Sequence, residues 1–232
     1  MKYGMHALGD SAVAVTAGEQ AGEETTAAVR AIAEAVGRAA LPEVTDVIQA
    51  YVNVTVCYDA SGGVTLEEMK ERLCDILKDV QPASPETGRT VEIPVCYGGE
   101  FGPDLPFVAE HNGLTEEEVI KIHSAGSYDV KMIGFAPGFP FLGGLDERIA
   151  APRRPSPRLE IPARTVGIAG SQTGVYPIGT PGGWQLIGRT PVDLFLPGEE
   201  IPSLLRPGDR VTFRPITQEE FDRKEDARHD QS

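Results

Sequence analysis

The stretch Gly134–Asp146 reads GFAPGFPFLGGLD, and a second stretch, Gln172–Trp184, reads QTGVYPIGTPGGW. Both are crowded with glycine, proline and aromatic residues. Neither forms a regular helix, because proline removes a backbone donor and glycine is costly to order. Shaped loops made of backbone and aromatic rings are where binding sites tend to lie. We therefore expect the chemistry of this protein to lie between the two stretches.

The composition is that of a globular protein. The chain has 232 residues, of which 41% are hydrophobic and 24% charged, enough for one large domain or two small ones with a buried core. No apolar run approaches the ~20 residues of a membrane helix, and the first residues lack the apolar core of a signal peptide. Three cysteines without a Cys-x-x-Cys pair indicate neither a disulfide framework nor a zinc site. These features favour a cytoplasmic protein.

The net charge of −14 argues against nucleic acid as a partner, because such binding depends on neutralising phosphates. The segment from residue 147 to 192 is different: it holds six arginines, no lysine and two acidic residues. Arginine grips carboxylate or phosphate with two parallel hydrogen bonds, so this segment favours an anion site over ordinary surface pairing. The arginines are Arg148, Arg153, Arg154, Arg158, Arg164 and Arg189.

Residues 1–85 are predicted to form an α+β domain with a ferredoxin-like fold. Residues 22–40 have helical apolar spacing, and residues 47–58 alternate as a half-buried strand. Thr65 and Glu68 form a Thr-x-x-Glu capping box at the start of a second helix. The composition of residues 81–89 is that of a linker.

Residues 90–216 are predicted to form a β-barrel or sandwich. A helix over residues 116–125, capped by Thr115 and Glu118, is the one helix expected there. Short apolar runs otherwise alternate with Gly/Pro turns, which favours β structure; they cover 91–97, 128–135, 165–169, 184–188, 192–195 and 210–214. The polar tail from 217 to 232 lacks an apolar stripe and is expected to be loose.

Several common catalytic motifs are absent from the sequence. It contains neither a Gly-x-x-x-x-Gly-Lys-Ser/Thr loop nor a Gly-x-Gly-x-x-Gly turn after a strand, and no His-Glu-x-x-His or Gly-x-Ser-x-Gly motif. A total of four histidines argues against a metal site. If the protein handles ATP, it uses an unorthodox site or one shared with a partner.

The two stretches contain the strongest candidate ligand contacts. Phe139 and Trp184, the single tryptophan, offer walls for an apolar or planar ligand, although each also suits a barrel core. Gly182 and Gly183 offer backbone N–H groups to a developing oxyanion. Gln172 offers both a donor and an acceptor.

His123 follows Val119 by one helical turn and precedes the first stretch. A histidine on a helix face is more often a hydrogen-bonded core residue than a catalyst. The proximity of His123 to the first stretch nevertheless favours a functional role. Arg153, Arg154 and Arg158 lie on a segment stiffened by proline, and cations held rigidly lose less entropy on binding.

Long motifs in a fixed order give the chain a family resemblance. They are His123, Gly134–Asp146, Pro152–Arg154, Pro157–Arg158, Gln172–Pro177, Pro181–Trp184 and Gly188–Pro191. In this pattern the chain resembles the allophanate hydrolase subunit 1 family, also called carboxyltransferase subdomain C/D. The resemblance extends over nearly the whole chain, from the N-terminal unit to residues 207–211.

The resemblance implies a fold and an activity. It implies a cyclophilin-like β-barrel after the α+β domain, and a subunit 2 partner that shares the site. One version of the family is the B-type subunit of an ATP-dependent 5-oxoprolinase, which opens 5-oxoproline to glutamate with A-type and C-type subunits. The chemistry suggested is phosphorylation of the amide oxygen by ATP, followed by attack of water.

Site roles follow as hypotheses from this resemblance. Catalytic roles are expected for His123, Arg158, Gln172 and Arg189. Substrate contacts are expected from Phe139, Arg153, Arg154, Gly182, Gly183 and Trp184.

Other functions are compatible with the same motifs. The family also includes an inhibitor of a sporulation histidine kinase, and long biotin-dependent chains with urea or allophanate chemistry. The barrel alone also suggests prolyl isomerase activity, a weaker inference because fold does not imply function.

One position departs from the family pattern. The family usually has Pro-Ala-Gly-Ser-Val where this chain has Pro162-Ala163-Arg164-Thr165-Val166. Arg164 in place of glycine is expected to prevent a close backbone approach there and to add a cation at the margin of the site.

Overall fold

The computed structural model describes residues 3–20, 22–81 and 88–229. It divides into two compact units, Met1–Gly88 and Arg89–Ser232, which are described separately. The predicted linker over residues 81–89 lies largely outside the described residues. None of the helices in the described ranges is long and apolar enough to cross a membrane.

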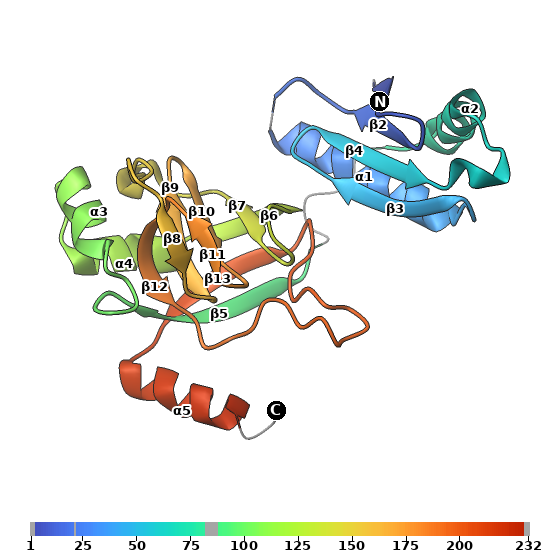
Figure 1. Ribbon diagram of the computed structural model, residues 1–232. Coiled ribbons are helices and arrows are strands. Elements are labelled where there is room, and N and C mark those ends of the chain that lie inside the picture. Colours follow the sequence, from blue (N-terminus) through green and yellow to red (C-terminus); the bar gives the residue numbers. More distant parts are fainter. Residues whose placement is uncertain (1–2, 21, 82–87, 230–232) are drawn as a thin grey trace. The chain divides into compact units, whose positions relative to one another are not determined.

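The N-terminal unit is a four-stranded antiparallel sheet, in the order β1-β2-β4-β3, with two helices packed on one face (Figure 1). Its elements are β1 (Gly4–Ala7), β2 (Ala12–Thr16), α1 (Glu23–Ala39), β3 (Val44–Gln49), β4 (Asn53–Tyr58) and α2 (Leu66–Leu77). The alternating residues Val13, Val15, Val54 and Val56 are fully buried against the helices, as period-2 strands require. The expected α+β unit is present, and its ferredoxin-like assignment stays a prediction.

Two local expectations for this unit have different outcomes. The capping box is confirmed: the Glu68 backbone donates to Thr65 Oγ1 at 3.2 Å, and the Thr65 backbone donates to Glu68 Oε2 at 2.9 Å. The single strand expected over residues 47–58 is wrong, because it is the hairpin β3–β4. The turn is closed by the Ala50 backbone N–H donating to the Asn53 carbonyl at 2.9 Å, which the apolar alternation does not indicate.

The C-terminal unit is a closed seven-stranded barrel, in the order β10-β7-β6-β13-β5-β12-β9 (Figure 1), consistent with the cyclophilin-like barrel. The barrel strands are β5 (Thr90–Tyr97), β6 (Ser127–Ile133), β7 (Pro140–Gly143), β9 (Thr165–Ala169), β10 (Gln172–Val175), β12 (Gln185–Arg189) and β13 (Arg210–Pro215). β8 (Arg158–Ile161) and β11 (Thr180–Gly182) pair separately as a two-stranded sheet. β13 joins β5 in parallel, and the other barrel pairs are antiparallel.

The C-terminal unit departs from the expected elements in several places, and β8 is a strand that was not expected. β7, β10 and β11 lie inside the two stretches interpreted as loops. Residues 192–195 are not a strand, apart from an isolated bridge between Phe195 and Ser203. A second helix, α3 (Leu105–Asn112), precedes α4 (Glu116–Ala125); its short length and its proline near the N-terminus weaken the sequence signal. The predicted capping box of Thr115 and Glu118 is confirmed.

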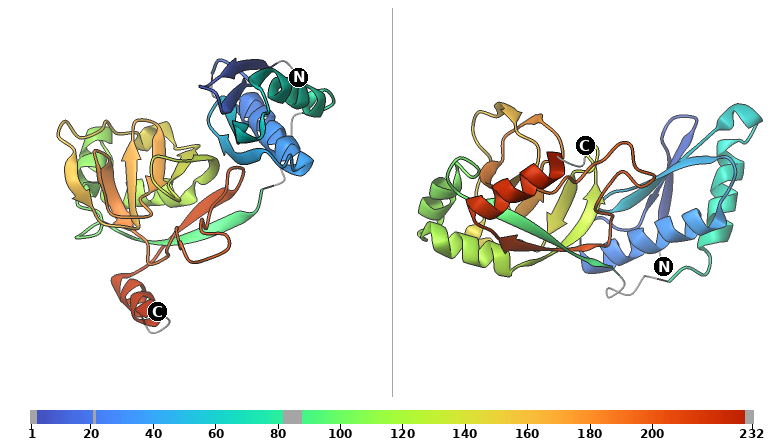
Figure 2. Two further views of the ribbon diagram at one scale, coloured as in Figure 1. Left: turned by 45° about the vertical axis from the view of Figure 1, so that its right-hand side comes forward. Right: turned by 90° about the horizontal axis from the view of Figure 1, so that it is seen from below.

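The tail is the largest correction. Residues 218–229, expected to be loose, form the helix α5 (Gln218–His229) outside the barrel wall (Figure 2). Phe221 is 3% exposed and its ring lies 4.5 Å from that of Phe101. Arg164 of the barrel forms an ion pair with Glu225 of the helix. One buried aromatic residue and several ion pairs hold the helix, so it needs no apolar stripe. Long-range ion pairs leave no periodic pattern in the sequence, which is why the helix was not expected.

Candidate functional site

A pocket of about 300 Å³ lies where the two Gly/Pro-rich stretches meet. β7 and the residues before it supply one wall, and Tyr176 after β10, β11 and the turn that follows β11 supply the other. The segment before β8 closes one side. The lining residues are Phe135, Phe139, Phe141, Arg153, Pro157, Tyr176, Pro181, Gly182, Gly183 and Trp184.

Aromatic rings in edge-to-face contact form the base of this pocket. The ring of Phe139 lies 5.6 Å from that of Trp184, 5.3 Å from Tyr176 and 5.0 Å from Phe141, all near perpendicular or steeply inclined. Such pairs are each worth about 0.5–1.5 kcal/mol beyond the buried area. Phe139 and Trp184 are 2% and 5% exposed, so they are both core anchors and pocket walls. The two interpretations offered for them from the sequence do not exclude each other.

Phe135 stands at the mouth of the pocket in an unusual conformation. Its φ angle is 69°, in the left-handed region, and its side chain is 69% exposed. A non-glycine residue held in that region costs on the order of 1 kcal/mol or more. Its ring contacts that of Phe139 at 5.5 Å. An exposed ring held in a strained loop beside a pocket is typical of a ligand or partner contact.

Packing against other atoms of the protein explains most of the glycines tested in the two stretches. A Cβ at Gly138 would lie 2.9 Å from Cβ of Phe195, and one at Gly143 would lie 2.7 Å from Cε of Lys131. A Cβ at Gly182 would lie 2.6 Å from the Tyr176 hydroxyl. At Gly183 the nearest atom would be 3.7 Å away, an ordinary contact. Close approach of the protein's own atoms therefore explains Gly138 and Gly143.

Tyr176 supplies a polar group to an otherwise apolar wall. Burial raises the pKa of its hydroxyl to about 12, although the Trp184 backbone and the cations Arg153 and Arg158 act in the opposite direction. The hydroxyl is therefore protonated throughout the physiological pH range. A buried phenol of this kind is suited to donate a hydrogen bond to a carbonyl oxygen.

Asp104 organises two of the predicted arginines beside the pocket. It is 5% exposed and accepts from Arg158 Nη1 and Nη2 at 2.9 and 2.8 Å, and from Arg154 Nη1 at 3.1 Å. The Leu186 backbone N–H also donates to this carboxylate, at 2.7 Å. Sequence reasoning missed Asp104, which lies 54 positions before Arg158 in no recognisable motif. Arg154 and Arg158 thus adjoin the pocket and share one carboxylate, so the three groups together keep one positive charge, and neither arginine lines the pocket.

Comparison with known proteins identifies the family. The family model described as "Carboxyltransferase domain, subdomain C and D" matches residues 3–205. The chain belongs to this family. The helix α5 lies beyond the matched residues.

Members of the carboxyltransferase C/D family resemble the chain along most of its length. The B-type subunit of the 5-oxoprolinase of Bacillus subtilis is 49% identical over 234 residues, covering 95% of this chain and 96% of the relative. That of Escherichia coli O157:H7 is 49% identical over 175 residues, covering 75% of this chain and 79% of the relative.

Two solved structures resemble this chain in fold. An uncharacterized protein of Pyrococcus horikoshii is 45% identical with a TM-score of 0.57, covering 94% of this chain and 99% of that one. The urea amidolyase of K. lactis shows the same fold at 20% identity, with a TM-score of 0.73 and 95% and 15% coverage.

Within this family member, His123 lies inside the barrel and not in the aromatic pocket. It is fully buried, and its Nδ1 and Nε2 lie 2.8 Å from Tyr97 Oη and 2.9 Å from Thr173 Oγ1. Thr173 Oγ1 donates to the Gly167 carbonyl, so it accepts from His123, and the tyrosine donates to Nδ1. Burial lowers the pKa of His123 to about 3. Both ring nitrogens have hydrogen-bond partners and the ring is neutral, which fits a core residue. The catalytic role expected for His123 stays a prediction.

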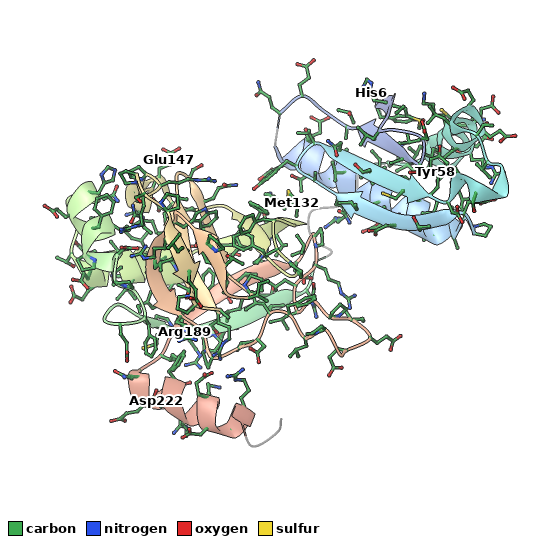
Figure 3. The ribbon with its side chains drawn as sticks, in the orientation of Figure 1. His6, Tyr58, Met132, Glu147, Arg189 and Asp222 are labelled. Atoms are coloured by element: carbon green, nitrogen blue, oxygen red, sulfur yellow. The ribbon has the colours of Figure 1, made fainter. Side chains whose placement is uncertain are left out.

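Arg189 and Gln172 also lie outside the pocket lining. Arg189 ends β12, where its Nε donates to the Ala163 carbonyl at 3.1 Å. Figure 3 shows it on the side of the barrel that faces α5, where Asp222 is labelled. Gln172 begins β10 opposite Ala169. The structure therefore gathers five of the predicted site residues at the pocket: Phe139, Arg153, Gly182, Gly183 and Trp184.

The side chain of Arg164 does not line the pocket, although its backbone N–H donates to the carbonyl of Tyr176, a lining residue. Arg164 is 5% exposed, has a φ angle of 68°, and forms a two-pronged ion pair with Glu225 of α5, one hydrogen bond being 2.9 Å long. Its Nε also lies 3.7 Å from Asp193. The positive φ explains why glycine suits this position in the family. The arginine here fastens the C-terminal helix to the barrel, which corrects the expectation of an added cation at the site.

Proposed function

We propose that this chain is a subunit of an ATP-dependent 5-oxoprolinase, which opens the lactam ring of 5-oxoproline to give glutamate together with partner subunits. The observation that carries the proposal is the 49% identity to a B-type 5-oxoprolinase subunit across 96% of that protein. Similarity over both units of the chain supports the same role in an assembly, beyond a shared fold.

The aromatic pocket supports this chemistry. Its volume of about 300 Å³ is at the lower end of ligand pockets, which suits a five-membered lactam. Phe139 and Trp184 offer apolar walls for the ring, and the protonated Tyr176 hydroxyl is suited to donate to the lactam oxygen. Opening the ring breaks the C–N bond: water gives hydroxyl to the carbonyl carbon and a proton to the nitrogen, while ATP is hydrolysed to ADP and phosphate.

The requirement for partner subunits is supported by the surface around the pocket. Phe135 is 69% exposed at its mouth, and Leu159 of β8 is 93% exposed. β8 pairs with β11, which carries Gly182 of the pocket wall. Large exposed apolar side chains beside a binding site are typical of a protein interface. In this proposal C-type and A-type subunits complete the site, and ATP is handled in the assembled complex.

Glutamate release from 5-oxoproline tests the proposal. The chain is combined with the A-type and C-type subunits of its own source and Mg-ATP, and each component is omitted in turn. The proposal expects activity only in the complete mixture. Activity on urea or another amide, with none on 5-oxoproline, would contradict it and favour the allophanate-type alternative. Absence of activity together with capture of a sensor histidine kinase would favour the inhibitor alternative, which otherwise stays a prediction.

A further inference from the structure

Most arginines between residues 147 and 192 form ion pairs with carboxylates of this chain. The ion pairs are Arg148–Asp146, Arg154–Asp104, Arg158–Asp104 and Arg164–Glu225, and Arg189 donates to a backbone carbonyl. Arg153 is different. It is exposed, it lines the aromatic pocket, and no carboxylate in the described part of the chain forms an ion pair with it. It is therefore the arginine of this segment whose full charge is available to a ligand in the pocket.

The position of Arg153 in the chain is fixed from both sides. The next residue, Arg154, donates its backbone N–H to the Gly183 carbonyl at 2.7 Å, which ties the segment to the opposite pocket wall. The preceding residue, Pro152, accepts from Gln185 Nε2 at 2.8 Å. Arg154 itself is held by Asp104. A guanidinium presented from a fixed backbone loses less entropy when it binds a carboxylate.

The three kinds of group in the pocket match three parts of one small molecule. The rings of Phe139 and Trp184 provide an apolar wall, the Tyr176 hydroxyl provides a donor, and Arg153 provides one cation. Accepting the function proposed above, we infer that Arg153 binds the carboxylate of 5-oxoproline and that the pocket selects a small cyclic amide bearing a single carboxylate. The ring then lies against the aromatic wall, and its amide oxygen faces Tyr176.

The same arrangement disfavours the triphosphate of ATP in this pocket. A triphosphate needs several cations or a cradle of backbone donors. The two neighbouring arginines are already bound to Asp104, with Arg158 contributing both of its terminal nitrogens. One uncommitted arginine in about 300 Å³ suits a monoanion. The ATP site of the complex is then formed outside this pocket.

Binding to the full-length chain tests the inference without requiring catalysis. Trp184 is the single tryptophan and lines the pocket, so its fluorescence reports occupancy, and calorimetry gives an independent affinity. The ligands are 5-oxoproline, 2-pyrrolidinone, which has the same lactam ring without the carboxylate, and Mg-ATP. The proteins are wild type, Arg153→Gln, Arg153→Lys and Arg148→Gln. Arg148 is a matched control because it lies in the same arginine-rich segment, is exposed, and pairs with Asp146 away from this pocket.

The expected result is that 5-oxoproline binds wild type and Arg148→Gln equally, and binds Arg153→Gln about ten- to a hundredfold more weakly, the range for a hydrogen bond to a charged group. Arg153→Lys recovers part of the affinity. 2-Pyrrolidinone binds weakly to all four proteins with no dependence on residue 153, and Mg-ATP leaves the fluorescence unchanged.

Three results would overturn the inference: equal 5-oxoproline affinity in Arg153→Gln and wild type, no binding of 5-oxoproline by the wild-type chain, or displacement of 5-oxoproline by Mg-ATP. Assays of the complete complex separate this failure from failure of the proposed function. A complex that is active with an unchanged KM for 5-oxoproline in Arg153→Gln would retain the function and refute the role of Arg153. An inactive complex, together with Arg153-dependent binding of 5-oxoproline to the chain alone, would retain the role of Arg153 and refute the proposed function.

Discussion

Asp104 and Arg158 form a bidentate ion pair, with Arg158 Nη1 and Nη2 2.9 and 2.8 Å from the two carboxylate oxygens of Asp104. The same carboxylate holds Arg154 and the Leu186 backbone N–H. The Asp104 carboxylate thus joins the start of α3, strand β12, the first residue of β8 and the segment before it at one buried point. It explains why three arginines in a short segment have different roles: Arg154 and Arg158 build the pocket, and Arg153 faces into it.

Replacing Asp104 with alanine is expected to destabilise the protein by about 1–3 kcal/mol, because the buried Leu186 N–H loses its acceptor and the half-buried Arg154 and Arg158 lose the carboxylate they share. Denaturant unfolding measures the change. Glu92→Ala, which removes an exposed carboxylate partner of Arg214, is the control and is expected to cost less than about 1 kcal/mol. Equal effects of the two substitutions would show that Asp104 does not organise this region.

The two adjacent glycines of the pocket wall are expected to respond differently to alanine. In Gly182→Ala the new Cβ would lie 2.6 Å from the Tyr176 hydroxyl and 2.7 Å from Cδ1 of Ile161, so we expect a loss of about 1–3 kcal/mol from overpacking and weaker ligand binding. Gly183→Ala meets its nearest atom at 3.7 Å and is expected to be tolerated. Thermal unfolding and ligand titration check both. Loss of activity in Gly183→Ala with normal stability would instead support a direct ligand contact at that backbone.

His123 is expected to make stability fall in acid. Its pKa is about 3 in the folded protein against an ordinary value of 6.5, so the unfolded chain takes up its proton first as the pH falls. The stability contributed by the neutral histidine is complete above pH 6.5 and is lost as the pH falls toward 3, by up to about 1.4 kcal/mol per pH unit.

Denaturant unfolding of wild type and His123→Gln between about pH 7 and pH 4 measures this effect. Glutamine keeps hydrogen-bonding capacity without titrating, so its unfolding free energy is expected to depend less on pH, and His111→Gln, at an exposed site, to behave as wild type. Identical pH profiles for all three would contradict the assignment.

The helix α5 is expected to depend on Glu225. Glu225→Ala leaves Arg164, which is 5% exposed, with Asp193 at 3.7 Å as its remaining acidic neighbour. We expect a loss of up to about 3–5 kcal/mol and faster proteolysis within residues 218–229. Glu219→Ala, at an exposed position of the same helix, should have little effect. If the helix resists protease equally in both variants, Phe221 alone is sufficient to hold it.

Local rules predicted a substantial part of this structure. Both capping boxes are confirmed because the pairs Thr65–Glu68 and Thr115–Glu118 act within one helical turn. The second unit is a barrel, as its short apolar runs between Gly/Pro turns indicate. The two aromatic stretches do meet at a pocket, which their composition suggested without giving its geometry.

The errors arose where distant residues decide the structure. The partners of Asp104 lie 50, 54 and 82 positions away, and the residues of the Arg164–Glu225 pair that fixes α5 lie 61 positions apart. No periodicity or motif reveals such contacts. His123 illustrates a different difficulty: a family motif marks the residue, but its burial and its two hydrogen-bond partners become visible only in the folded barrel.

ATP-dependent glutamate release from 5-oxoproline, measured with the A-type and C-type subunits in the presence and absence of this chain, tests the central claim most directly. The account predicts that release requires this chain, and that Arg153→Gln raises the KM for 5-oxoproline about ten- to a hundredfold with the KM for ATP unchanged. Full activity of the other subunits without this chain would contradict the proposed function.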